Sequence, residues 1–246
     1  MLVACLCAAA LLGTTSAPSV SQTYRERGAY LVDALAACGN CHTPHDATSK
    51  PIPGMELLRN GKRPDRTVIG PPMPLEFYRQ LSDRDAEAIA VYLKSLKPVR
   101  HPVPRSHYKL SQPPSHGPIV GHVAEPNPRD KIAYGAYLAG PVAHCMECHT
   151  PRDGPRLDMS RLGAGGRDLP DLGNPEGRTV SRNITPDPDA GLGRWSDADI
   201  KAAILLGHRP DGTKLARTMP FDAYNRMSSD DVNAIVDYLR SLKPLK

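Results

Sequence analysis

Large aromatic side chains are scarce in this sequence of 246 residues. It contains one Trp and two Phe, and aromatic residues make up 5% of the chain. A chain of this composition must pack mainly with aliphatic side chains, or take part of its core volume from a cofactor. Its length allows one large domain or two of ordinary size.

The sequence also lacks a strong excess of charge of one sign. The formal net charge is +5, and no segment of the chain concentrates the basic residues. Nucleic-acid-binding proteins usually carry a basic face that neutralises phosphates. We therefore expect no nucleic-acid partner.

Long apolar runs are missing after the first 21 residues. Residues 1–21 contain no charged side chain and begin with an apolar stretch, Leu2 to Leu12. This pattern is typical of a secretory signal peptide and predicts export, although the usual positive n-region is missing. Lipidation at Cys5 and a retained N-terminal anchor, which would associate the protein with a membrane, are the alternatives. No later stretch reaches the roughly 18–20 apolar residues that a membrane span requires.

Cysteine is absent outside the leader and two short motifs. Cys5 and Cys7 belong to residues 1–21, and the other four of the six cysteines form two pentads. These are Cys38-Gly-Asn-Cys41-His42 and Cys145-Met-Glu-Cys148-His149. No cysteine remains for a disulfide.

The pentads belong to an internal repeat. The block from Arg27 to Pro44 recurs from Tyr134 to Pro151, 107 residues later, and the block from Gly61 to Pro98 recurs from Gly207 to Pro244, 146 residues later. The first copy is therefore shorter by 39 residues. We predict two tandem domains, 22–97 and 131–246, joined by a Pro-rich linker at 98–130.

Each copy is predicted to begin and end with a helix. Apolar residues recur at helical spacing before each pentad and at the end of each copy, whereas strand-like alternation is nearly absent. Ser82 and Ser228 lie at the expected N-caps of the closing helices. Gly28 and Gly135 are expected to let the closing helix approach the opening helix closely. The predicted fold class is all-α.

Each pentad has the spacing for covalent attachment of heme c. The two thiols add to the two vinyl groups on one porphyrin edge, and the adjacent histidine reaches the iron. This composition predicts about 0.005 such pentads by chance. A thioredoxin-like redox pair would lie in a βαβ unit, which is missing, and two motifs 107 residues apart are poorly arranged for zinc. We predict two hemes, with His42 and His149 as iron ligands.

Met73 and Met219 are the predicted sixth ligands of the two irons. Each precedes a proline at the same place in its copy, about ten residues before the closing helix. The remaining internal methionines have no such counterpart, and we expect them to fill the core; they are Met55, Met146, Met159 and Met227. Three histidines that are not repeated, His45, His144 and His208, are expected at the surface.

These motifs resemble class I c-type cytochromes with one or two hemes. The resemblance covers roughly residues 22–97 and 131–246 and includes Asn183-Ile-Thr-Pro-Asp187, Gly193-Arg-Trp195 and Met219-Pro220. It is closest to cytochrome subunits of bacterial periplasmic dehydrogenases for alcohols, aldehydes or sugar acids. One departure is that the first copy lacks a counterpart of Asn183 to Ile200.

The resemblance implies a periplasmic electron carrier that is not itself an enzyme. The donor would be a periplasmic dehydrogenase or another redox protein, and the acceptor a quinone, a cytochrome or an oxidase. The alternative is a heme enzyme, either a diheme peroxidase or a thiosulfate-oxidising cytochrome. A peroxidase needs an open iron, whereas both copies supply a methionine. The thiosulfate type usually places a cysteine on the active iron, and none is spare here.

Two covalent hemes are the most direct prediction from the pentads. Mass spectrometry of the purified full-length chain should reveal two added tetrapyrroles, and replacing Cys145 and Cys148 by alanine should remove one of them. Finding only one tetrapyrrole, or none, in the unmodified protein would contradict the assignment.

Overall fold

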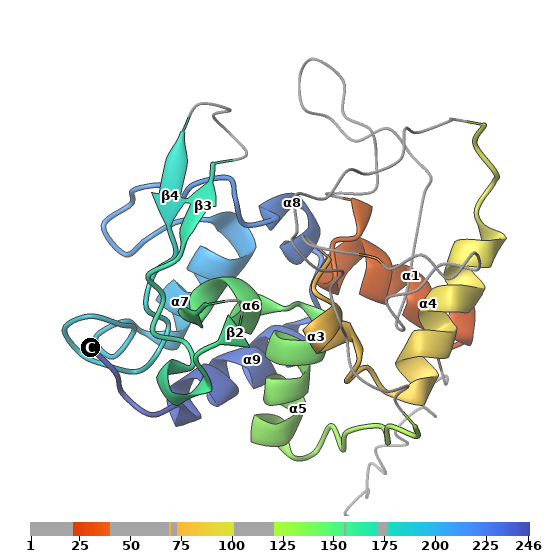
Figure 1. Ribbon diagram of the computed structural model, residues 1–246, viewed down its shortest axis with the longest axis horizontal. Helices are drawn as coiled ribbons and strands as arrows, with labels where there is room; N and C mark the ends of the chain where they lie inside the picture. Colours follow the sequence, from red (N-terminus) through yellow and green to blue (C-terminus); the bar gives the residue numbers. More distant parts are fainter. Residues whose placement is uncertain (1–21, 40–68, 70–72, 101–120, 155, 172–176) are drawn as a thin grey trace, which may run out of the picture.

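A computed structural model of the chain describes residues 22–39, 69, 73–100, 121–154, 156–171 and 177–246. The predicted leader, the pentad residues Cys41 and His42, and residues 101–120 of the predicted linker lie outside the described residues. The structure in Figure 1 is dominated by helices, and the opening and closing helices of each copy lie side by side.

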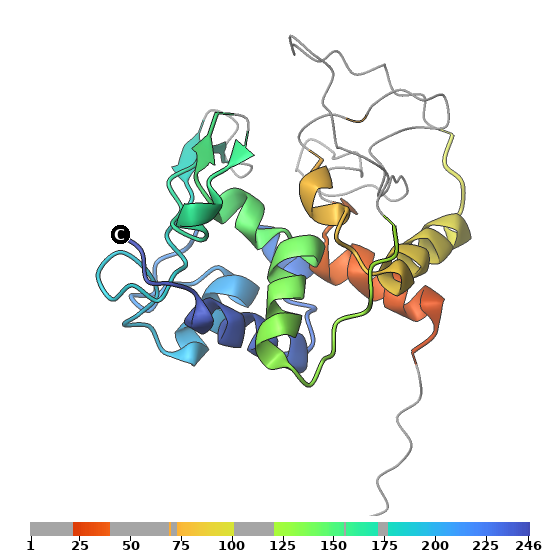
Figure 2. The ribbon, with the colours of Figure 1, turned by 60° about the horizontal axis from the view of Figure 1, so that its bottom comes forward.

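The described helices follow the same order in both copies. The first copy contains α1 (Tyr24–Tyr30), the π-helix η1 (Leu31–Leu35), α3 (Leu75–Tyr78) and α4 (Asp83–Ser95). The second copy contains α5 (Lys131–Tyr137), the π-helix η2 (Leu138–Val142), α6 (Cys145–His149), α7 (Asp197–Leu206), α8 (Phe221–Tyr224) and α9 (Ser229–Ser241). Figure 2 separates the two pairs, with α1 and α4 at one end and α5 and α9 nearer the middle.

The closing helices begin where their serines predict. The Ser82 hydroxyl accepts a hydrogen bond from the Asp85 backbone N–H at 3.1 Å, and Ser228 caps α9 through the Asp231 N–H at 3.2 Å. A capping serine satisfies one of the N–H groups that the first turn leaves without an intrahelical partner. Both N-cap predictions are confirmed.

Each opening helix widens into a π-helix before the first cysteine. The Ala36 N–H donates to the Leu31 carbonyl oxygen at 2.7 Å, and the Ala143 N–H donates to Leu138 at 2.8 Å. These bonds span five residues, as π-helical bonds do, and π-helical turns recur at functional sites. Helical periodicity alone does not predict the change from α- to π-helix, because both kinds of helix place the same residues on the buried face.

The opening and closing helices cross in backbone contact at a glycine. A Cβ atom built on Gly28 would lie 2.6 Å from the Ala88 carbonyl carbon, and one on Gly135 would lie 2.6 Å from the same atom of Ala234. The added Cβ atoms would also lie 2.6 Å from the Tyr92 Cβ and 2.8 Å from the Tyr238 Cβ, one helical turn further along the closing helices. The predicted close approach is confirmed in both copies.

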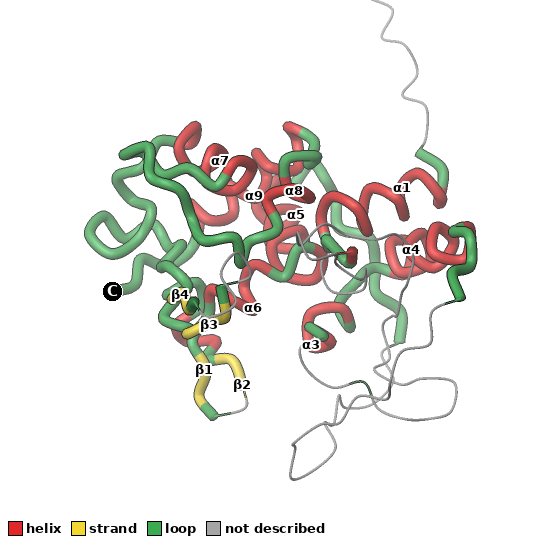
Figure 3. The backbone as a smooth tube through the Cα atoms, turned by 90° about the horizontal axis from the view of Figure 1, so that it is seen from above, coloured by secondary structure: helices red, strands yellow, loops and turns green. Residues whose placement is uncertain are grey.

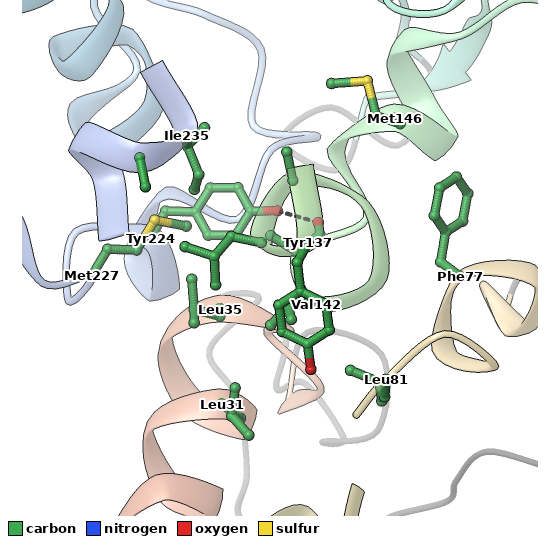
Figure 4. Packing of buried hydrophobic residues seen from close by; sticks show 14 of the residues in the cluster. Leu31, Leu35, Phe77, Leu81, Tyr137, Val142, Met146, Tyr224, Met227 and Ile235 are labelled. Atoms are coloured by element: carbon green, nitrogen blue, oxygen red, sulfur yellow. Dashed lines mark hydrogen bonds between the residues drawn. The ribbon is translucent and has the colours of Figure 1, made fainter. Parts of the chain in front are cut away.

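Buried apolar side chains from both copies form one continuous cluster (Figure 4). Leu31 and Leu35 of the first copy belong to it together with Leu138, Val142 and Ile235 of the second, and all five are nearly inaccessible to solvent. The two copies therefore share apolar core in the described part of the chain.

The all-α prediction needs a correction, because the second copy contains two small antiparallel sheets. β1 (Arg152–Asp153) pairs with β2 (Arg156–Leu157), β3 (Asp168–Pro170) pairs with β4 (Arg178–Val180), and the one-turn 3₁₀-helix η3 (Met159–Arg161) lies between the sheets. Figure 3 shows the first hairpin projecting from the helices. Strands of two or three residues are too short to display the alternation by which strands are predicted.

The end of the predicted linker lies against the start of α4. The Asp83 N–H donates to the Val123 carbonyl oxygen at 3.0 Å, and the Val123 N–H donates back to the Asp83 carboxylate at 3.2 Å. Arg84 and Glu125 form an ion pair at 2.7 Å. Among the helices of the described ranges, none has both the length and the apolar character needed to cross a bilayer.

The helix crossings predict a specific intolerance of side chains. Gly28→Ala or Gly135→Ala should destabilise the protein by about 1–3 kcal/mol, because the added methyl group must push two helices apart. This loss exceeds the gain of up to about 1 kcal/mol from better helix propensity. Gly140→Ala is the matched control, since the nearest atom to its Cβ would be a Phe77 carbon at 4.0 Å. Thermal unfolding of the heme-loaded variants checks this, and equal stability of all three would contradict it.

Candidate heme-binding site

The second pentad forms the short helix α6. His144 precedes it in the left-handed backbone conformation, with φ of 44°, and the Glu147 N–H donates to the His144 carbonyl oxygen at 3.0 Å. Residues three apart on a helix lie on one face, so Cys145 and Cys148 point to the same side. This is the arrangement that attachment to two vinyl groups on one porphyrin edge requires.

Cys145 and Cys148 are not joined in a disulfide. Burial raises the pKa of Cys145 to about 12, and burial followed by the nearby Glu147 carboxylate raises the pKa of Cys148. Reactive cysteines of redox pairs lie in electropositive surroundings that lower the pKa of the thiol. The electrostatics of α6 therefore argue against a thioredoxin-like pair.

His149 is held in the tautomer that suits an iron ligand. Its Nδ1 lies 2.7 Å from the Arg182 carbonyl oxygen. A carbonyl oxygen only accepts, so Nδ1 carries the proton and Nε2 keeps its lone pair for a metal. Burial also lowers the pKa of His149, which favours the neutral ring. The residues present fit a covalently attached heme.

A glycine-rich turn brings the Arg182 carbonyl to the histidine. The Gly165 N–H donates to the His149 carbonyl oxygen at 2.7 Å, and a Cβ on Gly165 would lie 2.5 Å from the Arg182 carbonyl carbon. Gly165 also has a φ of 71°, a conformation that glycine adopts without strain. The backbone of this turn therefore packs directly against the backbone that orients the histidine.

Arginine side chains surround the carboxylate within the pentad. Arg152 lies 3.5 Å and Arg167 4.0 Å from Glu147, and the Arg167 guanidinium also donates to the Glu147 carbonyl oxygen. Burial raises the pKa of Glu147, and the two arginines oppose this effect. These contacts tie the attachment helix to the segment that follows it.

The two predicted methionine ligands occupy equivalent backbone positions. Met73 and Met219 each lie just before a proline that caps a four-residue helix, with φ and ψ of −81° and 57° at Pro74 and −82° and 64° at Pro220. Both methionine side chains are partly buried and pack against the core cluster. Their role as sixth ligands remains a prediction, as does the first heme site, where Cys38 is described but Cys41 and His42 are not.

Several secondary expectations about Met and His can be compared with the structure. Met146 and Met227 are buried, as expected of core residues, but Met159 is 62% exposed. The expectation that His144 lies at the surface is wrong, because its ring packs edge-on against Tyr78 with a centroid distance of 5.9 Å. His208 is exposed as expected. Met55 and His45 lie outside the described residues.

The sequence of the second copy matches a known family. Residues 132–243 match the cytochrome c family. The chain therefore contains a cytochrome c domain. This domain includes α6, the turn that holds His149, and Met219, so the geometry described above belongs to it.

Relatives of the cytochrome extend the similarity over both copies. The chain is 31% identical over 204 residues to the cytochrome c subunit of alcohol dehydrogenase (quinone) from Gluconacetobacter polyoxogenes, covering 77% of this chain and 43% of that protein. It is 30% identical over 203 residues to the fructose dehydrogenase cytochrome subunit of Gluconobacter japonicus, covering 76% and 40%. It is 31% identical over 203 residues to a diheme cytochrome c-type protein of Cereibacter sphaeroides, covering 77% and 64%.

These comparisons confirm the resemblance to diheme and dehydrogenase-associated cytochromes. The chain spans less than half the length of the alcohol and fructose dehydrogenase subunits. Those relatives are named as the cytochrome subunits of dehydrogenases, in agreement with the prediction that this cytochrome is a carrier and not the catalytic subunit.

Sequence reasoning missed the group that orients His149. A backbone carbonyl such as that of Arg182 leaves no trace in residue identity. One signal was present, because the Gly163-Ala-Gly-Gly166 cluster lies in the segment between the second pentad and Met219, which is longer than its equivalent in the first copy. Clustered glycines indicate close backbone approach or positive φ, and both occur here.

The packing of Gly165 on Arg182 predicts that a side chain at position 165 changes the reduction potential of the heme through His149. Gly165→Ala should displace the Arg182 carbonyl and weaken its bond to His149 Nδ1, which makes the imidazole a poorer donor and raises the reduction potential of the second heme. Gly166→Ala is the matched control, since Gly166 also has positive φ, at 85°, but no atom within 4 Å of its Cβ. Spectroelectrochemical titration measures both potentials, and equal potentials in the two variants would refute the coupling.

Proposed function

We propose that the protein is a diheme c-type cytochrome that carries single electrons between periplasmic redox partners, from a dehydrogenase toward the respiratory chain. The observation that carries the proposal is α6, where the two thiols share one face and the adjacent His149 is fixed with Nε2 available. Similarity to cytochrome subunits of alcohol and fructose dehydrogenases supports the donor class.

The protein residues hold each heme in place and control the iron's surroundings. A bound heme c supplies an iron that changes between ferric and ferrous with its ligands in place. Cys145 and Cys148 would hold the porphyrin through their sulfurs, while the Arg182 carbonyl orients His149. A partly buried, hydrogen-bonded site of this kind needs little rearrangement when the charge on the iron changes.

Two hemes follow from the repeat of the pentad and are supported by the diheme relative. Cys38, Cys41, His42 and Met73 would hold the first heme, and Cys145, Cys148, His149 and Met219 the second. Methionine as the sixth ligand raises the reduction potential and closes the iron to small ligands. That coordination suits a carrier rather than a peroxidase.

The route proposed for electrons begins at a dehydrogenase and ends at a quinone, a cytochrome or an oxidase. Periplasmic location is proposed from the signal-like leader and from the class of the relatives. The N-terminal residues are the part of the chain proposed for association with a membrane. Copurification with a dehydrogenase, followed by its reduction of the cytochrome when substrate is added anaerobically, tests the donor assignment. A failure of every candidate dehydrogenase to reduce the protein would count against it.

Removal of either methionine tests the coordination. Met73→Ala and Met219→Ala should each remove half of the methionine–iron charge-transfer absorbance at the red end of the spectrum. Each should lower one reduction potential by on the order of 100 mV and let that iron bind cyanide. Met159→Ala, at a side chain that is 62% exposed, is the control and should leave the spectrum unchanged. If one iron of the unmodified protein binds cyanide or peroxide rapidly, the heme-enzyme alternative is favoured.

A further inference from the structure

The first opening helix reaches across to the second closing helix. The Tyr30 hydroxyl at the end of α1 donates to the Asp231 carboxylate at 2.6 Å and accepts a hydrogen bond from the Ser228 N–H at 2.9 Å. Ser228 and Asp231 are the N-cap and third residue of α9. A tyrosine of one copy therefore binds the start of a helix in the other.

The same contact is made in the opposite direction. The Tyr137 hydroxyl at the end of α5 donates to the Asp85 carboxylate at 2.8 Å and accepts from the Ser82 N–H at 3.1 Å. Tyr137 is the repeat equivalent of Tyr30, and Ser82 and Asp85 are the equivalents of Ser228 and Asp231. Each copy thus uses one surface to bind the matching surface of the other, as the subunits of a two-fold dimer do.

Each tyrosine completes a helix cap in the other copy. In the capping box of α1, the Glu26 side chain accepts from the backbone N–H of the N-cap residue, Thr23. In α4 and α9 the backbone N–H of the N-cap serine donates instead to a tyrosine hydroxyl of the other copy. The same hydroxyl donates to the carboxylate of the aspartate three residues after that serine. Separation of the copies would leave both helix starts without these partners.

The contacts are buried and charged, so their loss is costly. Asp85 is 1% and Asp231 6% exposed. Arg27 binds Asp85 through two bonds of 2.8 Å, whereas Tyr134, the repeat equivalent of Arg27, donates to Asp231 at 3.0 Å. Burial and then the bond to Asp231 raise the pKa of Tyr30 to about 12, which keeps its hydroxyl protonated as a donor. A buried carboxylate that loses a donor pays a large desolvation cost.

The elements joined in this way also carry the heme attachments. Tyr30 leads through η1 to Cys38, and Tyr137 leads through η2 to Cys145. Each π-helix contacts the short helix that follows the predicted methionine ligand of the other copy, α8 for η1 and α3 for η2. His144, next to Cys145, packs on Tyr78 and has its Nε2 3.4 Å from the Ala36 carbonyl oxygen.

We propose that these reciprocal contacts form an inter-repeat lock that fixes the separation of the two hemes, with Tyr30 and Tyr137 as positioning residues for electron exchange between them. The lock consists of Tyr30, Tyr137, Ser82, Ser228, Asp85 and Asp231. The proposal rests on the proposed function, because it assigns a role in electron exchange. The lock also has a structural consequence: loss of one tyrosine should let the whole interface between the two copies open. This consequence does not depend on the proposed function.

A single conservative substitution tests the lock in the full-length, heme-loaded protein. In Tyr30→Phe, the Ser82 amide keeps its own acceptor, Tyr137, so it loses hydrogen-exchange protection only if the whole interface opens. We expect its protection to fall about tenfold, from the loss of hydrogen bonds to a buried charge. After rapid reduction of part of the hemes, we expect the equilibration between the two hemes to be slower than in the unmodified protein. Tyr24→Phe, on the same helix at a side chain that is 46% exposed, should match the unmodified protein.

The outcomes separate the lock from the function. Unchanged protection at Ser82 would overturn the lock, and lost protection with unchanged heme-to-heme equilibration would overturn the positioning role. Absence of any equilibration between the hemes of the unmodified protein would overturn the positioning role, whereas failure of a dehydrogenase to reduce either heme would overturn the proposed function. Lower protection of the Ser82 amide and slower equilibration between the hemes in Tyr30→Phe, with Tyr24→Phe unaffected and both heme spectra retained, is the result that supports the proposal.

Discussion

The arrangement depends on the backbone contact between opening and closing helices at Gly28 and Gly135. Only hydrogen at Cα lets the Ala88 and Ala234 carbonyls lie this close. The contact puts the end of each opening helix near the middle of the molecule, where its tyrosine meets the other copy and its π-helix leads to a cysteine. A wider crossing would move the attachment cysteines and the inter-repeat contacts together.

The polar groups at the centre are nearly symmetric, with one informative exception. Asp85 is neutralised by Arg27, whereas Asp231 relies on the hydroxyls of Tyr30 and Tyr134. Arg27 therefore lies near two buried carboxylates that are equivalent in the repeat, and it forms its hydrogen bonds with one of them. Among the described residues, the first copy supplies the cation of this network, and its charge acts on Asp231 as well as on Asp85.

The second copy has a longer segment between its cysteines and Met219, and this segment supplies the backbone group that orients His149. It contains the small sheets and the glycine turn that brings the Arg182 carbonyl to His149. The strands carry little core and are mostly exposed at their surfaces. Their contribution is to place one backbone oxygen beside the imidazole, which fixes the tautomer of the predicted iron ligand.

The sequence by itself determined the repeat, the two pentads, the helix caps and the glycine crossings. These features are local, or they recur at a fixed spacing, so residue identity is enough to reveal them. The pentad predicts heme c because cysteine and histidine at that spacing have few other uses. Helical periodicity could not reveal the π-helices, since both kinds of helix bury the same residues.

Only the tertiary structure decided how the two copies meet. Tyr30 reads as an ordinary residue of an amphipathic helix, and its partner Asp231 lies 201 residues away. Likewise, His144 appeared to be a surface residue because its environment comes from Tyr78 in the other copy. The role of the Arg182 carbonyl cannot be predicted from the sequence, because every residue has a backbone carbonyl. Contacts between distant backbone and side-chain groups depend on the packing of whole helices, and no local pattern encodes that geometry.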